Sequence, residues 1–108
     1  MNEDIEELIK ILKGKGLNNS IRLGILIALY YVNGYVTFTD LLRSLDIPRS
    51  SLHEHLNILR REGLIEIRRA ITVMGVRTVI RITEQGKLVV KKYMEIMRRL
   101  SNNENHKP

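Results

Sequence analysis

Two short amphipathic helices, separated by a break, are predicted between Thr37 and Ile65. Apolar residues of the first helix recur at i, i+3, i+4 and i+7, the spacing that buries one helix face: Phe38, Leu41, Leu42 and Leu45. The chain then breaks at Asp46-Ile47-Pro48, because a residue that precedes proline is disfavoured in the helical conformation. The second helix is expected to begin at Pro48 and to end before Gly63.

This second helix, residues 48–62, carries leucines on one side and polar side chains on the other. Leu52, Leu56 and Leu59 predict the buried side. The polar residues lie opposite, with His53 on their flank: Ser50, Glu54, Asn57 and Arg61. A helix that is held from behind by leucines and exposes only polar groups suits the major groove of DNA. Residues 37–62 are therefore interpreted as a helix-turn-helix.

Alternating apolar and polar residues after Gly63 predict a β-hairpin, the wing, over residues 64–83. The segment is rich in β-branched residues, and strands are expected near 64–71 and 77–83 with the tip at Val73-Met74-Gly75. Positive side chains toward the tip suit phosphates or a minor groove: Arg68, Arg69 and Arg77.

Both ends of the chain are also expected to be helical. Residues 2–13 carry an apolar stripe, and residues 83–100 carry apolar residues spaced 4, 3 and 4, the seam of a paired helix. Residues 20–33 are apolar on nearly every side and predict a central helix. The terminal stripes exceed what a small core needs and predict a homodimer interface: Ile5, Leu8, Ile9, Leu12, Val89, Tyr93, Ile96 and Leu100. The alternative is that the last seam packs on its own domain.

Length and composition narrow the possible functions. A chain of 108 residues supports one small domain, expected at residues 1–100, ahead of a polar, disordered tail at 101–108. No apolar run approaches the roughly 18–20 residues that span a membrane. The first residues are acidic, unlike a secretory signal, and there is no cysteine, so a cytoplasmic location is expected.

Positive charge is concentrated in the second half of the chain. The net charge is +6, with a pI near 9.9. Acidic residues crowd the first predicted helix, whereas residues 40–100 contain thirteen Lys or Arg against seven Asp or Glu. This distribution favours a polyanionic partner at the helix-turn-helix and wing, with the first helix away from it.

The sequence offers little support for catalysis. It contains no glycine-rich phosphate loop, no nucleophile elbow and no H-E-x-x-H motif. His53 and His55 are two positions apart, so on a helix they point to different sides and are not expected to share a metal ion. We therefore expect neither an enzyme nor a bound metal or cofactor.

Two segments carry a resemblance to a known group of proteins. LHEHLNILRREGLI, residues 52–65, resembles the second helix and first wing strand of winged helix-turn-helix regulators of the MarR and ArsR type. RTVIRITEQGK, residues 77–87, is similar to the pattern with which their second wing strand enters the last helix. The resemblance covers roughly Ser20 to Leu100. It implies the short strand that pairs with the wing in this group, at Tyr35-Val36-Thr37.

The sequence departs from this group at three points. Asp46 stands in the turn where glycine is usual, and aspartate tolerates the left-handed conformation better than most residues. Glu54 stands where many relatives carry a basic residue. The absence of cysteine means that the thiolate metal-sensing sites of the ArsR branch do not carry over.

Together these patterns predict an α+β, mostly helical fold: a winged helix-turn-helix with an added N-terminal helix and a long C-terminal helix. The expected function is that of a sequence-specific regulator of the prokaryotic or archaeal type, a homodimer that binds double-stranded DNA. The alternatives are a winged helix that binds protein and a chromatin protein indifferent to sequence. The sequence does not show whether a small-molecule effector binds. The expected DNA-binding residues are Arg49, Ser50, Ser51, His53, Glu54, Asn57, Arg60, Arg61, Arg68, Arg69 and Arg77.

Overall fold

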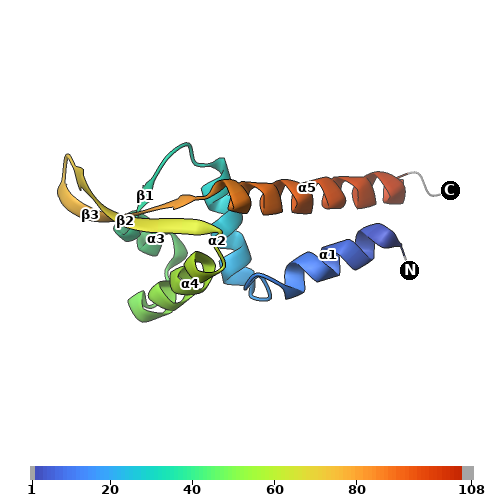
Figure 1. Cartoon of the computed structure of the whole chain (residues 1–108), viewed down its shortest axis with the longest axis horizontal. Coiled ribbons are helices and arrows are strands. Elements are labelled where there is room, and N and C mark those ends of the chain that lie inside the picture. Colours follow the sequence, from blue (N-terminus) through green and yellow to red (C-terminus); the bar gives the residue numbers. More distant parts are fainter. Residues whose placement is uncertain (1, 106–108) are drawn as a thin grey trace.

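Figure 1 shows the protein, a computed structural model that describes residues 2–105, as an elongated molecule with a β-hairpin at one end and two helices at the other. Within residues 2–105 there are five helices and one three-stranded sheet. The elements are α1 (Glu3–Lys13), α2 (Ser20–Tyr31), β1 (Val36–Thr37), α3 (Phe38–Leu45), α4 (Arg49–Arg61), β2 (Ile65–Thr72), β3 (Gly75–Ile82) and α5 (Glu84–Asn105). The order confirms the predicted winged helix-turn-helix with an added helix at each end.

The core confirms the leucine seam of α4. Leu52, Leu56 and Leu59 are at most 2% exposed, and they belong to one apolar cluster with Ile25 and Leu26 of α2. Burying a leucine side chain completely contributes about 1.5–3 kcal/mol, so this seam is a principal attachment of α4 to the domain. The opposite side of α4 is left in contact with solvent.

The sheet is antiparallel, in the order β1-β3-β2. Ile65 pairs with Ile82 and Ile67 with Ile80, and these residues lie on the face that covers the core. Because successive side chains alternate between the two faces of a strand, Glu66 and its partner Arg81 lie on the outer face. The hairpin of β2 and β3 continues beyond the core as the wing (Figure 1).

Local signals set the ends of α3 and α4, with one correction. The Thr37 hydroxyl accepts a hydrogen bond from the Asp40 N–H at 3.1 Å, so Thr37 is the N-cap of α3. Asp46 has φ 52° and ψ 49°, the left-handed conformation expected of the turn. The expectation that α4 begins at Pro48 is wrong by one residue. Pro48 is the N-cap, with extended ψ of 145°, and the helix begins at Arg49.

The other boundaries differ slightly from prediction. Helix α2 ends at Tyr31, ahead of the predicted residue 33, because Val32 is already extended. Gly75 pairs with Thr72, so it belongs to β3 and the tip turn is Val73-Met74 alone. Helix α5 continues to Asn105, so residues 101–105 are helical where a tail was expected. The remaining part of that predicted tail, 106–108, lies outside the described residues.

The junction between the wing and α5 is closely packed. The Thr83 hydroxyl accepts from the Gly86 N–H at 3.0 Å, as expected of a cap, and donates to the Gly63 carbonyl at 2.7 Å. A Cβ atom at Gly86 would collide with the Leu64 carbonyl oxygen and the Ile82 side chain. Glycine at this position therefore allows α5 to approach the start of β2.

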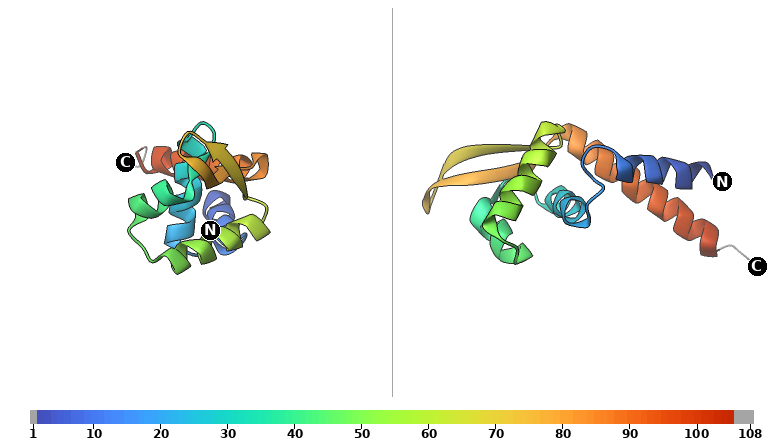
Figure 2. Two further views of the ribbon diagram at one scale, coloured as in Figure 1. Left: turned by 90° about the vertical axis from the view of Figure 1, so that its left-hand side faces the viewer. Right: turned by 90° about the horizontal axis from the view of Figure 1, so that it is seen from below.

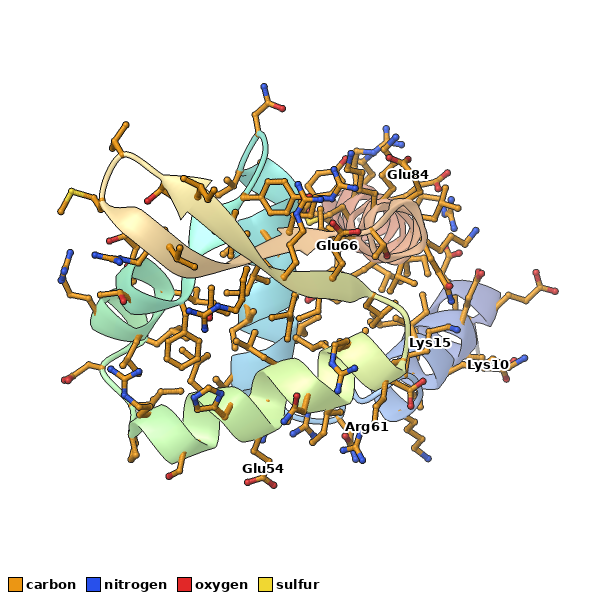
Figure 3. All side chains as sticks on the ribbon, turned by 60° about the vertical axis from the view of Figure 1, so that its left-hand side comes forward. Lys10, Lys15, Glu54, Arg61, Glu66 and Glu84 are labelled. Atoms are coloured by element: carbon orange, nitrogen blue, oxygen red, sulfur yellow. The ribbon has the colours of Figure 1, made fainter. Side chains whose placement is uncertain are left out.

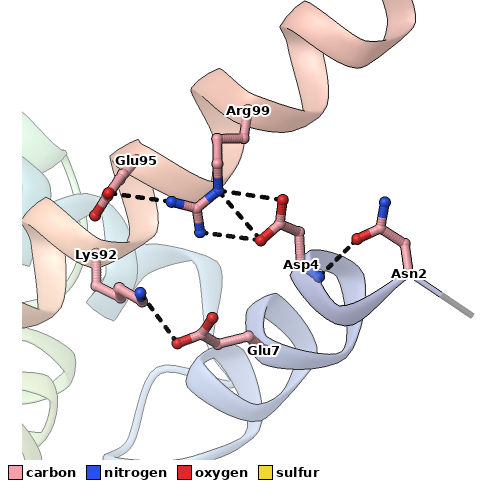
Figure 4. A network of polar contacts seen from close by, with 6 residues as sticks. All are labelled: Asn2, Asp4, Glu7, Lys92, Glu95 and Arg99. Carbon is pink, nitrogen blue, oxygen red and sulfur yellow. Dashed lines mark hydrogen bonds and ion pairs between the residues drawn. The ribbon is translucent and has the colours of Figure 1, made fainter.

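Helices α1 and α5 lie beside each other at the end opposite the wing (Figure 2). Figure 4 shows the ion pairs that join them: Arg99 to Asp4 at 2.9 Å and Lys92 to Glu7 at 3.3 Å. The acidic first helix is therefore partly neutralised by the last helix and lies far from the wing. No helix within residues 2–105 is long and apolar enough to cross a bilayer.

Candidate nucleic-acid interface

The solvent-facing side of α4 carries most of the predicted DNA contacts. Figure 3 shows two of them, Glu54 and Arg61, projecting from α4 away from the sheet. The leucines on the other side of the helix hold this surface in place. The exposed residues of α4 are Arg49, Ser50, His53, Glu54, Asn57, Arg60 and Arg61. We call these seven residues the α4 surface.

Ser51 lies apart from the α4 surface. It is half-buried and shares the flank of α4 that carries the half-buried His55 and Ile58. His55 Nδ1 lies 3.2 Å from an Arg22 guanidinium nitrogen, and the same guanidinium donates to the Gly16 carbonyl at 2.6 Å. Ser51 therefore lies on the flank of α4 that faces the loop between α1 and α2, and not on the α4 surface.

The contact between Arg22 and His55 depends on a neutral imidazole. Burial lowers the pKa of His55, and the positive charge of Arg22 lowers it further. The neutral ring can then accept from the Arg22 guanidinium through Nδ1. His55 accordingly joins α4 to the loop before α2.

Phe38 orients two members of the α4 surface. The His53 ring stacks on the Phe38 ring with 4.5 Å between centroids and 26° between planes. The Arg49 guanidinium lies 5.3 Å from the centroid of the same Phe38 ring. His53 stays exposed but is oriented along α3, so any base contact would use the edge of a ring that is already stacked.

A hollow joins the α4 surface to the wing. It has a volume of about 250 Å³ and lies between α4 and the sheet. One wall is largely polar and comes from α4, and the other comes from β2 and β3, so helix and wing form one continuous surface. The lining residues are Phe38, His53, Leu56, Asn57, Arg60, Ile67 and Thr78.

The structure divides the predicted wing arginines between the two faces of the sheet. Arg69 pairs with Thr78 and shares the face of Ile67, which looks toward α4. Arg68 and Arg77 have the opposite parity and lie on the outer face. These three residues, which the sequence placed together, therefore do not form one cluster.

Arg68 belongs to a group on the outer face that the sequence analysis missed. Its guanidinium lies 4.5 Å from the centroid of the Tyr35 ring, and that of Arg81 lies 5.1 Å from it. The Tyr35 hydroxyl donates to Glu66 at 2.8 Å, and Arg81 forms an ion pair with Glu66 at 3.1 Å. The Tyr35 hydrogen bond lowers the pKa of Glu66, with Arg81 acting in the same direction. This group ties the segment before β1 to the base of the wing.

The group of Tyr35, Glu66, Arg68 and Arg81 was not predicted because the expected hairpin tip implies a different register of β2 with β3. The predicted three-residue tip pairs Glu66 with Ile82, whereas the observed two-residue tip pairs Glu66 with Arg81. A shift of one residue in the pairing exchanges the set of β3 side chains that share a face of the sheet with Glu66. Tyr35 is 31 residues from Glu66, so its part in the group depends on tertiary contact.

The predicted dimer residues fall into three groups that differ in burial. Ile96 is completely buried although it lies outside the main core, on the stretch of α5 between Lys92 and Arg99 that pairs with α1. Ile5 and Ile9 are exposed, at 37% and 39%. The others are half-buried: Leu8, Leu12, Val89, Tyr93 and Leu100. In a single chain, then, Ile96 already packs against its own domain while Ile5 and Ile9 are uncovered.

Metal ligands do not converge in the described structure. Across residues 2–105, no group of three or more His, Cys, Asp or Glu side chains is placed to hold a metal ion. His53 and His55 lie on different sides of α4, one against Phe38 and the other against Arg22.

Comparisons with known proteins agree with this geometry. An uncharacterized protein of Methanocaldococcus jannaschii is 32% identical over 89 residues, covering 82% of this chain and 96% of that protein. The structure of a transcriptional regulator homologue from Pyrococcus horikoshii is 31% identical, covers 91% of this chain and 96% of that one, and has a TM-score of 0.76. HlyU, a transcriptional regulator from Vibrio vulnificus, is 26% identical, covers 87% and 92% of the two chains, and has a TM-score of 0.61.

A fourth comparison concerns the fold alone. A structure from Enterococcus faecalis, described as a regulator of the MarR family, is 16% identical with a TM-score of 0.74, covering 97% of this chain and 92% of that one. The model of the winged helix DNA-binding domain matches residues 21–101, from the central helix α2 through the wing into α5. On this match, and on the helix-turn-helix and wing described above, the chain belongs to the winged helix DNA-binding domain family.

Proposed function

We propose that this protein is a transcriptional regulator that binds double-stranded DNA in a sequence-specific manner. The observation that carries the proposal is the continuity of the α4 surface with a wing that has no acidic residue from Ile67 to Thr83. The names of the Pyrococcus and Vibrio relatives, both transcriptional regulators, agree with it. The acidic α1 lies at the opposite end of the molecule, away from any phosphate backbone (Figure 1).

The proposed binding mode places α4 in the major groove. Ser50 in the first turn of α4 and Asn57 in its second half would contact base edges. Arg60 and Arg61 near the end of the helix, with Arg69 and Arg77 of the wing, would neutralise phosphates. Glu54 would accept a hydrogen bond from a cytosine amino group, which would offset the cost of a carboxylate near phosphates.

We propose further that the protein acts as a homodimer through α1 and α5. Ile5, Ile9 and Met97 are exposed apolar residues on these two helices, and Tyr93 and Leu100 are only half-buried. Apolar side chains left uncovered on paired helices favour association with a second copy. We also propose that this regulator is not an enzyme and that it acts in the cytoplasm.

A selection of bound sequences from random duplex DNA, followed by footprinting, tests the proposed function. Two half-sites about one helical turn apart are expected, because each copy would present one α4 to the same side of the duplex. If each subunit neutralises roughly 3–5 phosphates, log K should fall against log salt concentration with a slope of order −5 to −9.

Other outcomes would contradict different parts of the proposal. A single short protected site would reject the dimer. Binding of equal strength to all sequences would favour the sequence-indifferent chromatin protein. No DNA binding at low salt would reject the function itself and favour a winged helix that binds protein.

A further inference from the structure

Exposed apolar side chains gather at the far end of the wing. Ile71 and Val76 face each other across the hairpin, and Val73 and Met74 form the turn between them. Their exposed fractions are 89% for Ile71, 103% for Val73, 71% for Met74 and 50% for Val76. We call these four residues the wing tip. A contiguous apolar group so fully in contact with water indicates a surface that another molecule covers.

The wing tip is held in a defined shape. The Thr72 hydroxyl donates to the Gly75 carbonyl at 2.8 Å and accepts from the Met74 N–H at 3.1 Å. Gly75 has φ 97°, a conformation that other residues rarely adopt, and it closes the turn opposite Thr72. Because these bonds involve the backbone and Thr72, the Val73 and Met74 side chains are presented without taking part in them.

Charge restricts the partner of the wing tip. Arg69 and Arg77 flank it on the two faces of the hairpin, and no acidic residue occurs from Ile67 to Thr83. The partner should therefore be apolar where it meets the tip and negative around it. The minor groove of DNA has this character, because phosphates border a groove that accepts apolar side chains between base steps.

The wing tip is also placed to reach that groove. Ile71 and Val76 lie on the sheet face of Arg69 and Thr78, and Thr78 lines the hollow beside α4. Figures 1 and 2 show the wing and α4 at the same end of the molecule. A duplex whose major groove holds α4 therefore passes beside the hairpin, and the adjacent minor groove is the part that the tip can enter.

We propose that the wing tip is an apolar wedge that enters this minor groove and bends the duplex, with Val73 and Met74 against the base step and Arg69 and Arg77 on the bordering phosphates. The inference rests on the proposed DNA-binding function. It adds a source of specificity, because flexible pyrimidine–purine steps deform more easily than A-tracts. The wing would thus select sequence through DNA deformability, while α4 selects it through base edges.

The test combines a protein change with a DNA change. The protein variant is the double substitution Val73→Ser and Met74→Ser, and the DNA variant replaces the step opposite the tip by an A-tract. Wild-type protein on the selected site should bend it, as measured by energy transfer between dyes at the two duplex ends. We expect each change alone to weaken binding about tenfold to a hundredfold and to reduce the bend. Both together should cost little more than either alone, since they remove the same contact.

Two controls accompany this cycle. Tyr31→Ser also removes an exposed apolar side chain, 66% exposed on α2, and should leave affinity and bend unchanged. The salt slope of the double variant should equal that of the wild type, because no phosphate contact is lost. Its melting temperature should also be unchanged, because both altered side chains are in water.

The outcomes separate this inference from the function on which it rests. Wild-type protein that binds no DNA rejects the proposed function. Wild-type protein that protects the selected site, with a double variant of equal affinity and bend, rejects the wedge alone. Loss of binding to anionic lipid vesicles by the double variant, with unchanged DNA binding, would identify a membrane as the partner of the tip and overturn the inference.

Discussion

Single side chains outside α4 determine how the α4 surface is presented. Phe38 stacks beneath His53 and lies near Arg49, so the first turn of α3 fixes the direction of two predicted DNA contacts. On the other flank, Arg22 reaches His55 and the carbonyl of Gly16. The orientation of the recognition helix therefore depends on polar and aromatic contacts as well as on the leucine seam.

His55 makes stability depend on pH. Its pKa in the folded protein is lowered by burial and by Arg22, so the unfolded chain binds a proton more readily. The melting temperature should therefore be unaffected by His55 above its ordinary pKa of about 6.5 and should fall as the pH drops below it. His55→Asn keeps an acceptor but cannot become charged, and it should flatten the decline. His53→Asn, which leaves the Arg22 contact intact, should retain it; equal curves for wild type and His55→Asn would contradict the argument.

Gly86 and Gly24 form a matched pair for testing close packing. Gly86→Ala should destabilise the protein by about 1–3 kcal/mol, because its Cβ would collide with the Leu64 carbonyl and the Ile82 side chain. Gly24 lies inside α2 with nothing within 4 Å of its Cβ position. Gly24→Ala should therefore stabilise the helix by up to about 1 kcal/mol. Urea denaturation measures both; a neutral Gly86→Ala would show that α5 can shift away from β2.

At the scale of elements, the hairpin separates two kinds of contact. Its inner face continues the surface of α4 through Arg69 and Thr78, whereas its outer face holds the group of Tyr35, Glu66, Arg68 and Arg81. The outer group ties the base of the wing to the segment before β1. The base of the wing is thereby fixed, while the outer part of the hairpin is free to meet a partner.

Helix and wing should differ in what their mutation changes. Asn57→Ala should weaken binding to the preferred site by about 1–3 kcal/mol and relax the preference at one base position, as expected of a base contact. Arg77→Ala should weaken binding to all sequences about equally and reduce the salt slope by about one. Affinity measured on specific and unrelated duplexes over a salt series tests both. An unchanged salt slope for Arg77→Ala would place that side chain away from the phosphates.

At the scale of the whole molecule, the two ends have different surfaces. One end carries α4 and the wing, and the other carries α1 and α5 with their ion pairs and apolar residues (Figures 1 and 4). Asp4 and Arg99 are 95 positions apart in the sequence, so their contact closes the chain on itself. Because the predicted dimer surface and the predicted DNA surface lie at opposite ends of the molecule, one chain could bind a second copy and a duplex at the same time.

Tyr93→Glu tests the dimer at this scale. If Tyr93 meets its copy in a second subunit, two carboxylates would enter one desolvated interface, each at a cost of several kcal/mol. The variant should stay folded by circular dichroism, sediment as a monomer and bind a two-half-site operator far more weakly. Lys91→Glu introduces a carboxylate at an exposed, already polar position of α5 off the predicted seam and should remain dimeric. A folded, dimeric Tyr93→Glu protein would exclude this seam as the interface.

Much of the fold could be predicted from short-range patterns. The spacing of Leu52, Leu56 and Leu59 identified the buried side of α4, and the expected start of the last helix at residue 83 coincides with the Thr83 cap of α5. These signals lie within a few residues of the structure they specify, because caps and helix faces depend on neighbouring turns. The family resemblance rested on the same local segments and is confirmed by the family match over residues 21–101.

The sequence by itself thus determined the elements, their order and the polar character of α4. Tertiary structure decided which side chains meet. The register of β2 with β3 placed Arg81 opposite Glu66, Phe38 turned His53 along α3, and the approach of α1 to α5 enclosed Ile96. The physical reason is that periodicity specifies a face of one element, whereas a contact between distant residues depends on how the faces of two elements pack.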